Sequence, residues 1–469
     1  MEILGYSHNA RMSENPVMKM SPQYNRLAAA IDSGQMRERL QKQLGHSEGA
    51  DLELRDFHIA RVFPRSDDSF TIQYRMNIKS DKRNTSRPMI LCGYLLGETE
   101  NWPEYIETNK KQVMVFEDLR LIVPIFPFDP YLPAIAELCV KGDLPPALQK
   151  GASNVIADLP NAGIVDFEVL GYRLERRCVV RYRLGDSGNN SDNPRTINIV
   201  IKIARPSKMK ESKKCLSLLE KGGFAGNGNN GLTAPLTYHI DIKNGIQISE
   251  WAPGKTLHNL TGDKQFPPSC KEAALLLRKL HKVDSSSLTK NSITDELASL
   301  DGKIRLISSV FPEFASSFKS CLETIMTSSQ ELDNDFESAC VHRDFYDKQI
   351  LYSAERSTLL DFDSLACGDP AQDFGNFIAH LLLRQLQEPI NAQNISEGIR
   401  AFKSAYGFLD KSFEKRVNWW QAAALLRLGF LYSLRPKWHH LSTNLLNNVF
   451  ANIQGNQTQM EGVNENYRS

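Results

Sequence analysis

The residues best suited to chemistry lie in the stretch Val341–Leu351 and in the segment Leu359–Asp363 that follows it. The first stretch contains an H-x-D motif that ends at Asp344, followed five residues later by the side-chain amide of Gln349. Phosphoryl transfer from ATP needs one carboxylate to orient or deprotonate the attacking hydroxyl, and it needs an amide oxygen and a second carboxylate to hold metal ions. The pattern therefore predicts Asp344 as the catalytic residue, and Gln349 and Asp361 as ligands of Mg²⁺.

This segment resembles the catalytic core of the aminoglycoside phosphotransferase and choline kinase family, relatives of the protein kinases. The continuation Gly368-Asp-Pro-Ala-Gln-Asp-Phe-Gly-Asn-Phe377 strengthens the resemblance, because a G-D-P-x-x-D stretch after the metal aspartate is a hallmark of that family. The resemblance covers about residues 165–440. It implies an α+β, two-lobed protein-kinase-like fold with a small β-rich N-lobe and a mostly helical C-lobe. It also implies ATP and Mg²⁺ as cofactors and a small-molecule hydroxyl group as the phosphate acceptor.

A kinase-like N-lobe needs a lysine on its third strand to reach the phosphates and a glutamate on the next helix to hold that lysine. Lys202 lies alone within Ile199-Val-Ile-Lys-Ile203, and a lysine among aliphatic residues is expected to point into a polar cleft. Glu211, in the first turns of the helix predicted over Lys208–Lys221, resembles the family glutamate better than Glu220 near its end. We therefore expect Lys202 to bind the phosphates with Glu211 as its partner, and Glu220 is the alternative.

The segment Ser249–Leu257 resembles the family hinge, where backbone groups that follow a strand pair with the adenine edge. The resemblance implies that Glu250, Trp251 and Ala252 flank the adenine. His281 matches a histidine of the family's interlobe helix, for which a structural role is expected.

Three features depart from the family pattern. The turn Leu174–Arg177 contains no Gly-rich phosphate loop, so that Arg176 or Arg177 is a candidate to contact a phosphate directly. Gln349 stands where the family usually has Asn. Maltokinase-like sugar kinases also have Gln there, so this sequence resembles them at that position. Arg343 stands where the family commonly has Gly in the H-x-D motif, and in this respect the motif resembles that of the protein kinases. Nothing in the sequence resembles the activation segment of those kinases with its A-P-E motif, so peptide substrates are not expected.

The elements that position these residues change in character along the chain. Phe70, Ile72 and Tyr74 alternate with polar residues, which is typical of a half-buried strand, whereas the pattern becomes helical from Lys271 onward. An extra N-terminal mixed domain is therefore expected before the kinase-like lobes. The predicted parts are a polar N-terminal segment (1–50), an N-terminal β-containing domain of unknown role (51–150), the N-lobe (165–255), the helical C-lobe (256–450) and a disordered tail (451–469).

Composition narrows the class of protein. The 469 residues carry 56 Lys and Arg against 55 Asp and Glu, so no global basic field favours nucleic acid or an anionic membrane. The longest apolar runs fall short of the ~20 residues of a membrane helix. The eight cysteines form no C-x-x-C pair, and the first residues lack the apolar core of a signal peptide. A cytoplasmic location is the simplest interpretation.

The sequence thus favours an ATP-dependent kinase that phosphorylates a small-molecule hydroxyl, with a catalytically silent kinase-fold binding or regulatory module as the alternative. A sugar or an anionic metabolite fits the basic helical region better than an aminoglycoside or amino alcohol, which stay as alternative substrates. Trp419, Trp420 and Trp438 are candidates to stack on sugar rings, with core packing as the other possibility. The basic residues of that region are Lys403, Lys411, Lys415, Arg416, Arg427, Arg435 and Lys437.

Overall fold

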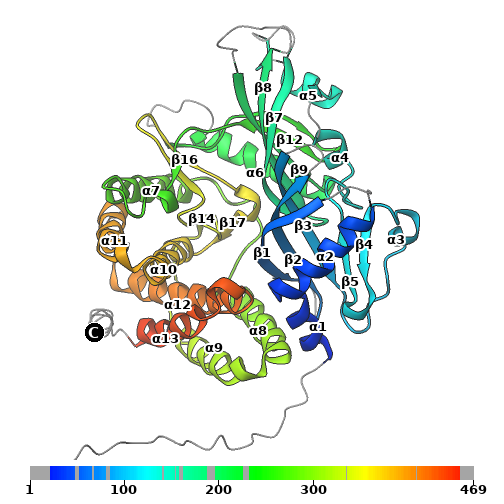
Figure 1. Ribbon diagram of the computed structural model, residues 1–469. Coiled ribbons are helices and arrows are strands. Elements are labelled where there is room, and N and C mark those ends of the chain that lie inside the picture. The colour runs from blue at the N-terminus through cyan, green and yellow to red at the C-terminus, as the bar shows by residue number, and fades with distance from the viewer. Residues whose placement is uncertain are drawn as a thin grey trace, which may run out of the picture.

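The computed structural model of the chain describes residues 22–47, 52–65, 68–80, 85–139, 142–153, 155–157, 162–186, 196–224, 232–333, 335–407 and 409–454. The disorder predicted for the tail falls almost entirely outside these residues. The described part contains an N-terminal sheet with two helices, a second β-rich lobe and a helical lobe. In Figure 1 they lie at the right, at the top and at the lower left, respectively.

The N-terminal unit is a five-stranded antiparallel sheet with strand order β1-β2-β3-β5-β4. Its elements are α1 (Pro22–Ala30), α2 (Ser33–Ser47), β1 (Leu52–Pro64), β2 (Phe70–Ser80), β3 (Thr85–Leu95), β4 (Val113–Phe116) and β5 (Leu121–Pro124). The Tyr74 hydroxyl donates to the Ala30 carbonyl oxygen at 3.0 Å, so one face of the sheet packs against the helices. A short helix, α3 (Tyr105–Thr108), lies between β3 and β4.

Strand β2 is buried on both faces, whereas its alternation of apolar and polar residues predicted that only one face is buried. Gln73 and Thr71 are buried along with Ile72 and Tyr74. The Gln73 side-chain amide donates to the Tyr172 carbonyl oxygen at 2.7 Å, so the polar face of this strand lies against the second β lobe. The polar side chain of Gln73 therefore lies in a buried interface between the two sheets rather than facing water.

The second β lobe is a six-stranded antiparallel sheet with strand order β11-β12-β9-β8-β7-β6. Its strands are β6 (Gly142–Asp143), β7 (Ala162–Arg173), β8 (Arg177–Asp186), β9 (Thr196–Ala204), β11 (Thr237–Asp241) and β12 (Ile246–Glu250), accompanied by the helices α4 (Ala134–Leu138), α5 (Pro146–Gly151) and α6 (Pro206–Leu219). Leu138 and Leu148 belong to the same apolar cluster as Ile199 and Ile201. The sheet thus includes β6, which precedes the boundary predicted near residue 150.

The helical lobe follows. Its helices are α7 (Phe266–His281), α8 (Ile293–Val310), α9 (Ala315–Ser329), α10 (Ala371–Gln387), α11 (Ala392–Tyr406), α12 (Lys411–Ser433) and α13 (Leu441–Ile453). The short strands are β10 (Leu232–Thr233), β13 (Lys255–Thr256), β14 (Ala339–Val341), β15 (Ile350–Tyr352), β16 (Ser357–Leu359) and β17 (Ala366–Gly368). α12 is buried around most of its circumference, since its sequence is apolar on nearly every side. The backbone of α12 comes so close to α10 at Gly375 that a Cβ there would lie 2.6 Å from the Gln421 nitrogen.

The N-terminal unit contacts both lobes. Tyr24 of α1 packs edge-on against Phe311, which follows α8, with ring centroids 5.5 Å apart. Arg65, just after β1, pairs with Glu175 in the β7–β8 turn at 2.7 Å. The predicted α+β architecture, with two kinase-like lobes preceded by an extra N-terminal unit, is therefore confirmed. Among the residues described, no helix is both long and apolar enough to cross a membrane.

Candidate active site

The H-x-D motif forms a loop between β14 and β15, and this loop is held by Asp373 at the start of α10. The two Asp373 carboxylate oxygens accept the backbone N–H groups of His342 and Arg343, each at 2.7 Å. His281 lies 3.3 Å from the same carboxylate, and its other ring nitrogen lies 2.8 Å from the Tyr406 hydroxyl. Asp373 and His281 therefore position the loop, and for His281 this is the structural role that the sequence indicated.

Asp344 and Gln349, predicted as catalytic residue and metal ligand, lie side by side. The Gln349 side-chain nitrogen donates to an Asp344 carboxylate oxygen at 3.3 Å. Burial raises the pKa of Asp344 above its ordinary value, against the opposing effect of the His342 ring. A carboxylate with a raised pKa is better suited to accept a proton from a hydroxyl group.

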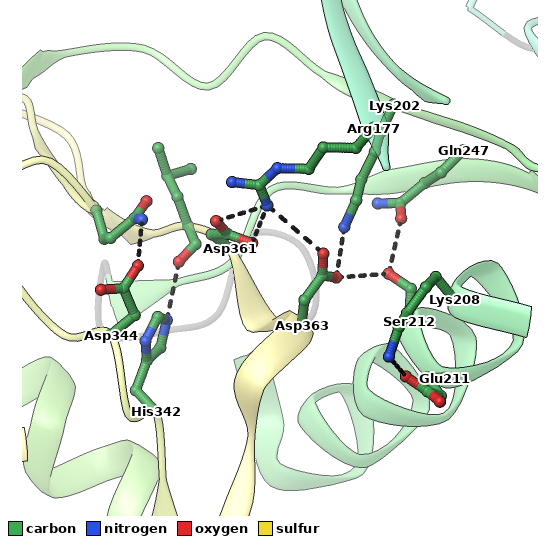
Figure 2. Close-up of polar contacts among 12 residues, drawn as sticks. Arg177, Lys202, Lys208, Glu211, Ser212, Gln247, His342, Asp344, Asp361 and Asp363 are labelled. Atoms are coloured by element: carbon green, nitrogen blue, oxygen red, sulfur yellow. Dashed lines mark hydrogen bonds and ion pairs between the residues drawn. The ribbon is translucent and has the colours of Figure 1, made fainter. Parts of the chain in front are cut away.

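Asp361 and Lys202 approach each other from opposite lobes, as Figure 2 shows. Arg177, at the start of β8, donates to the two Asp361 oxygens at 3.0 and 3.2 Å. Lys202 on β9 pairs with Asp363, which also accepts a hydrogen bond from the Ser212 hydroxyl at 3.3 Å. Burial opposes ionisation of Asp361, but the charges of Arg177 and Lys202 outweigh it and hold its pKa below the usual value.

Two residues of this site adopt left-handed backbone conformations. Arg343 has φ 68° and Asp361 has φ 60°. Such strain costs about 1–3 kcal/mol for a residue other than Gly, and it clusters at sites where the surrounding structure fixes an unusual direction of the chain. Arg343 immediately precedes Asp344, and Asp361 is itself one of the proposed metal ligands.

The prediction that Glu211 is the partner of Lys202 does not hold in this structure. Glu211 is exposed and pairs with Lys208 at 2.8 Å, away from the cluster around Asp363 (Figure 2). The buried face of α6 instead presents Ser212, together with Met209 and Cys215. Each residue of a helix is rotated about 100° from the next, so a shift of one position moves a side chain off the face toward the cleft. Glu220, the alternative, lies beyond the end of α6 and is also exposed.

The predicted hinge lies at the end of β12. The Glu250 carboxylate is engaged by Arg356 and by the Leu236 backbone N–H at 2.8 Å, so this side chain joins the turn between β15 and β16 to the sheet. Ala252 is buried, and Arg181 lies over the Trp251 ring at 5.0 Å. Within the described residues the backbone N–H groups of Trp251 and Ala252 have no hydrogen-bond partner. Trp251 and Ala252, unlike Glu250, therefore have backbone N–H groups available to pair with an adenine edge.

Asp347 in the same loop is a structural residue, a role that the sequence did not indicate. Its carboxylate is completely buried and accepts hydrogen bonds from Arg384 at 2.7 and 3.2 Å. The His258 ring lies 3.1 Å away. Burial alone raises the pKa of a carboxyl, but here Arg384 and His258 overcome it and lower the pKa of Asp347 well below its usual range. Its neighbour Lys348 is exposed.

The aromatic and basic residues of the helical lobe are mostly committed to its core. Trp419 and Trp420 are buried, and their indole nitrogens donate to Ile325 and Asp369, each at 3.0 Å, so neither is a free platform for a sugar ring. Many of the basic side chains there are likewise paired with acidic ones. These pairs are Lys415 with Glu331, Arg416 with Asp369 and Arg427 with Glu296.

The donor set fits Mg²⁺, a hard cation that prefers oxygen ligands. Asp361, Asp363 and the amide oxygen of Gln349 supply only oxygen atoms, and no group of three or more His, Cys, Asp or Glu side chains in the described chain forms a complete metal cage. Mg²⁺ is usually bound by one or two carboxylates, with waters and substrate phosphates in the remaining positions. Asp361 would have to exchange Arg177 for the ion.

A β lobe and a helical lobe joined by a hinge, with a lysine of the first lobe opposite an aspartate of the second, define a protein-kinase-like fold. Within this fold, residues 192–408 match the model of the family described as "Phosphotransferase enzyme family". The match confirms, over these residues, the resemblance to the aminoglycoside phosphotransferase and choline kinase family. No curated protein matches the sequence significantly.

Several solved structures are similar to the chain. A choline/ethanolamine kinase family protein from Mesorhizobium loti has 16% identity and a TM-score of 0.45, covering 66% of this chain and 94% of its own. A spectinomycin phosphotransferase in complex with ADP and spectinomycin has 13% identity and a TM-score of 0.42, covering 64% and 98%. A choline kinase from Streptococcus pneumoniae has 14% identity and a TM-score of 0.42, covering 66% and 99%. With TM-scores below 0.5, these likenesses add nothing about what this chain binds.

Proposed function

We propose that this chain is an ATP-dependent phosphotransferase that phosphorylates a hydroxyl group of a small molecule, with sugars as the first candidates. The observation that supports this proposal best is the convergence of Lys202, from the β lobe, with Asp361 and Asp363 from the helical lobe, beside the loop that carries Asp344. These are the groups that positioning and charge stabilisation require for phosphoryl transfer.

In this proposal each residue has one role. Asp344 orients the acceptor hydroxyl and takes its proton, which its raised pKa favours. Lys202 releases Asp363 and binds the nucleotide phosphates. Asp361 and Gln349 hold Mg²⁺, which when bound would offset negative charge on the phosphates. The free backbone groups of residues 251–252 bind the adenine edge.

Arg177 replaces the missing Gly-rich loop in this scheme. Its guanidinium lies 3.0 Å from Asp361 at the turn that would cover the phosphates. Arginine binds carboxylate and phosphate groups with the same fork of donors, so nucleotide binding would exchange one partner for the other. Arg177 would then stay in the site as a phosphate ligand.

The test is Mg²⁺-dependent release of ADP from ATP with pools of sugars, aminoglycosides and choline-like alcohols. We expect turnover in one pool, a loss of roughly 10²–10⁴-fold in Asp344→Ala, and a loss at least as large in Asp361→Ala. Glu211→Ala is the matched control, because its exposed carboxylate pairs with Lys208 on the same helix, and it should keep wild-type turnover. Equal losses in Glu211→Ala and Asp361→Ala would contradict the assigned roles.

The second candidate function is a catalytically silent module that keeps the fold. It is favoured by two pairs, Arg177 with Asp361 and Lys202 with Asp363, which already neutralise the carboxylates proposed for Mg²⁺. The two functions differ in nucleotide binding. A Mg²⁺-dependent gain in affinity for a non-hydrolysable ATP analogue supports the kinase, whereas Mg²⁺-independent binding without turnover in any pool supports the module.

A further inference from the structure

Two cysteines lie directly opposite each other on the strands that flank the catalytic loop. Cys340 of β14 and Cys367 of β17 are register partners in the antiparallel pairing of these two strands. Both carry free thiols. Among the strands that the structure describes, no other register pair consists of two cysteines. The pair is therefore a feature of this one place in the fold.

The backbone hydrogen bonds of Cys367 show which kind of strand pair this is. Its N–H group donates to the Thr289 carbonyl oxygen at 2.9 Å, and its carbonyl oxygen accepts from the Asn291 N–H group at 2.8 Å. Both backbone groups thus point away from β14, so Cys340 and Cys367 form a non-hydrogen-bonded pair. In such a pair the Cα atoms lie about 4.5 Å apart, and the two side chains share one face of the sheet.

This spacing is compatible with a disulfide bond. The Cα atoms of disulfide-bonded cysteines usually lie about 4.4–6.8 Å apart, and their Cβ atoms lie about 3.8 Å apart. Directly opposite residues of an antiparallel pair have Cβ atoms about 4.5–5.5 Å apart, with non-hydrogen-bonded pairs at the short end. Strands β14 and β17 would therefore have to approach each other by roughly 0.5–1 Å to form the bond.

The two thiols differ in exposure, and this difference sets the order of the reaction. Cys340 is completely buried, and burial raises the pKa of its thiol to about 12. A buried thiol of this kind is inert toward an oxidant in solution. Among the cysteines, all of which lie in described parts of the chain, Cys367 alone is not buried. An oxidant therefore reaches Cys367 first, and Cys340 is the neighbour that can react with it afterwards.

We propose that Cys340 and Cys367 form a redox modification site, which a small disulfide such as oxidised glutathione converts to a cross-strand disulfide. The Cys367 thiolate attacks the small disulfide, forming a mixed disulfide and releasing one small thiol. The Cys340 sulfur then attacks the Cys367 sulfur, and its proton passes to the second small thiol as that thiol leaves. The two protein thiols are thereby oxidised, and the small disulfide is reduced to two thiols.

The disulfide acts on the catalytic groups through the two strands. Cys340 lies four residues before Asp344, and Cys367 lies four residues after Asp363. Drawing β14 and β17 together displaces the loops that carry these carboxylates. Because a misplacement of about 1 Å can cost a factor of about 10² in rate, we expect oxidation to lower turnover about tenfold or more. This consequence rests on the proposed function, whereas the disulfide itself does not.

The test counts the free thiols of the full chain before and after incubation with oxidised glutathione, and it locates any disulfide by mass spectrometry. Cleavage after Glu337 separates Cys340 from Cys321, so that the peptides distinguish these two. We expect the wild type to lose two of its eight free thiols through a Cys340–Cys367 link that a reductant removes. Cys367→Ser should form no disulfide within the chain. Cys215→Ala is the matched control, because Cys215 lies on α6 outside the strand pair, and it should lose the same two thiols.

The outcomes separate the redox site from the proposed function. A wild type that keeps all its thiols, a glutathione adduct that persists on Cys367, or a disulfide that joins Cys340 to Cys215 would each overturn the site. Release of ADP should slow about tenfold or more in the oxidised wild type, recover in reductant and stay unchanged in oxidised Cys367→Ser. Unchanged turnover in the disulfide-bonded wild type would overturn the effect on catalysis. Absence of turnover in the reduced protein refutes the proposed function instead, and the thiol count still decides the redox site.

Discussion

Neutralising Asp347 should destabilise the protein far more than neutralising a surface carboxylate. In Asp347→Asn the Arg384 guanidinium, only 3% exposed, would be left with an uncharged partner in place of two charge-assisted contacts at 2.7 and 3.2 Å. Breaking a buried ion pair on one side costs roughly 3–5 kcal/mol, because the remaining charge stays desolvated. That is a large part of a typical unfolding free energy of about 5–15 kcal/mol.

The assay is equilibrium unfolding in urea, followed by both circular dichroism and tryptophan fluorescence so that coincident transitions confirm a common free energy. The matched control is Glu331→Gln. Glu331 pairs with Lys415 at 3.1 Å, but both side chains are more than half exposed, at 69% and 51%. Its loss should cost less than about 1 kcal/mol.

Two further results follow from the same contacts. The double variant Asp347→Asn/Arg384→Met should recover part of the loss, because it removes the unpaired buried charge. The pKa of Asp347 is lowered by folding, so its contribution is complete above about pH 4, the ordinary value of the unfolded carboxyl, and is lost as pH falls toward the folded value. An Asp347→Asn loss no larger than that of Glu331→Gln, or a double variant less stable than Asp347→Asn, would refute the reasoning.

Three further predictions concern catalysis. Asp373→Ala should lower kcat roughly 100-fold by releasing the N–H groups of His342 and Arg343, while calorimetry shows unchanged affinity for the ATP analogue; a normal kcat would contradict its positioning role. Because burial raises the pKa of Asp344, kcat should fall with decreasing pH at a higher pH than for an ordinary carboxyl, and a profile flat down to pH 4 would argue against Asp344 as the base. Chelation by EDTA should abolish ADP release and excess Mg²⁺ should restore it, whereas turnover that survives EDTA would remove Asp361 from its proposed role.

The sequence predicted those parts of the site that depend on short-range order. The spacing of Asp344, Gln349 and Asp361 is a property of one loop and two short strands, and these three do lie in one region. The position of Lys202 opposite Asp363 agrees with the prediction that a charged side chain within an aliphatic strand points into a polar cleft, because such a side chain is costly to bury. The first inference needed only the spacing of residue types within one segment, and the second needed only the composition of one strand.

The contacts that the sequence missed all join distant residues. The structural role of Asp347 could not be predicted, because its partners Arg384 and His258 lie 37 and 89 residues away along the chain. The assignment of Glu211 failed for a different reason. The helix itself was predicted correctly, but which residue faces the cleft depends on the packing of α6, and the structure places Ser212 there.

The turn that stands in place of a Gly-rich loop is held by contacts from the N-terminal unit. Glycines let a loop wrap phosphates with its backbone, whereas the β7–β8 turn offers the side chain of Arg177 and must therefore be held in place. Glu175 at the tip of this turn is buried, its N–H donates to Asp129 at 2.9 Å, and its carboxylate accepts from Arg65 of the N-terminal unit at 2.7 Å. Under the proposed function, a flexible turn would lose conformational entropy each time that nucleotide binding ordered it. Arg65 and Asp129 fix the turn beforehand, so the proposed function gives the N-terminal unit a part in nucleotide binding, because it reduces that cost.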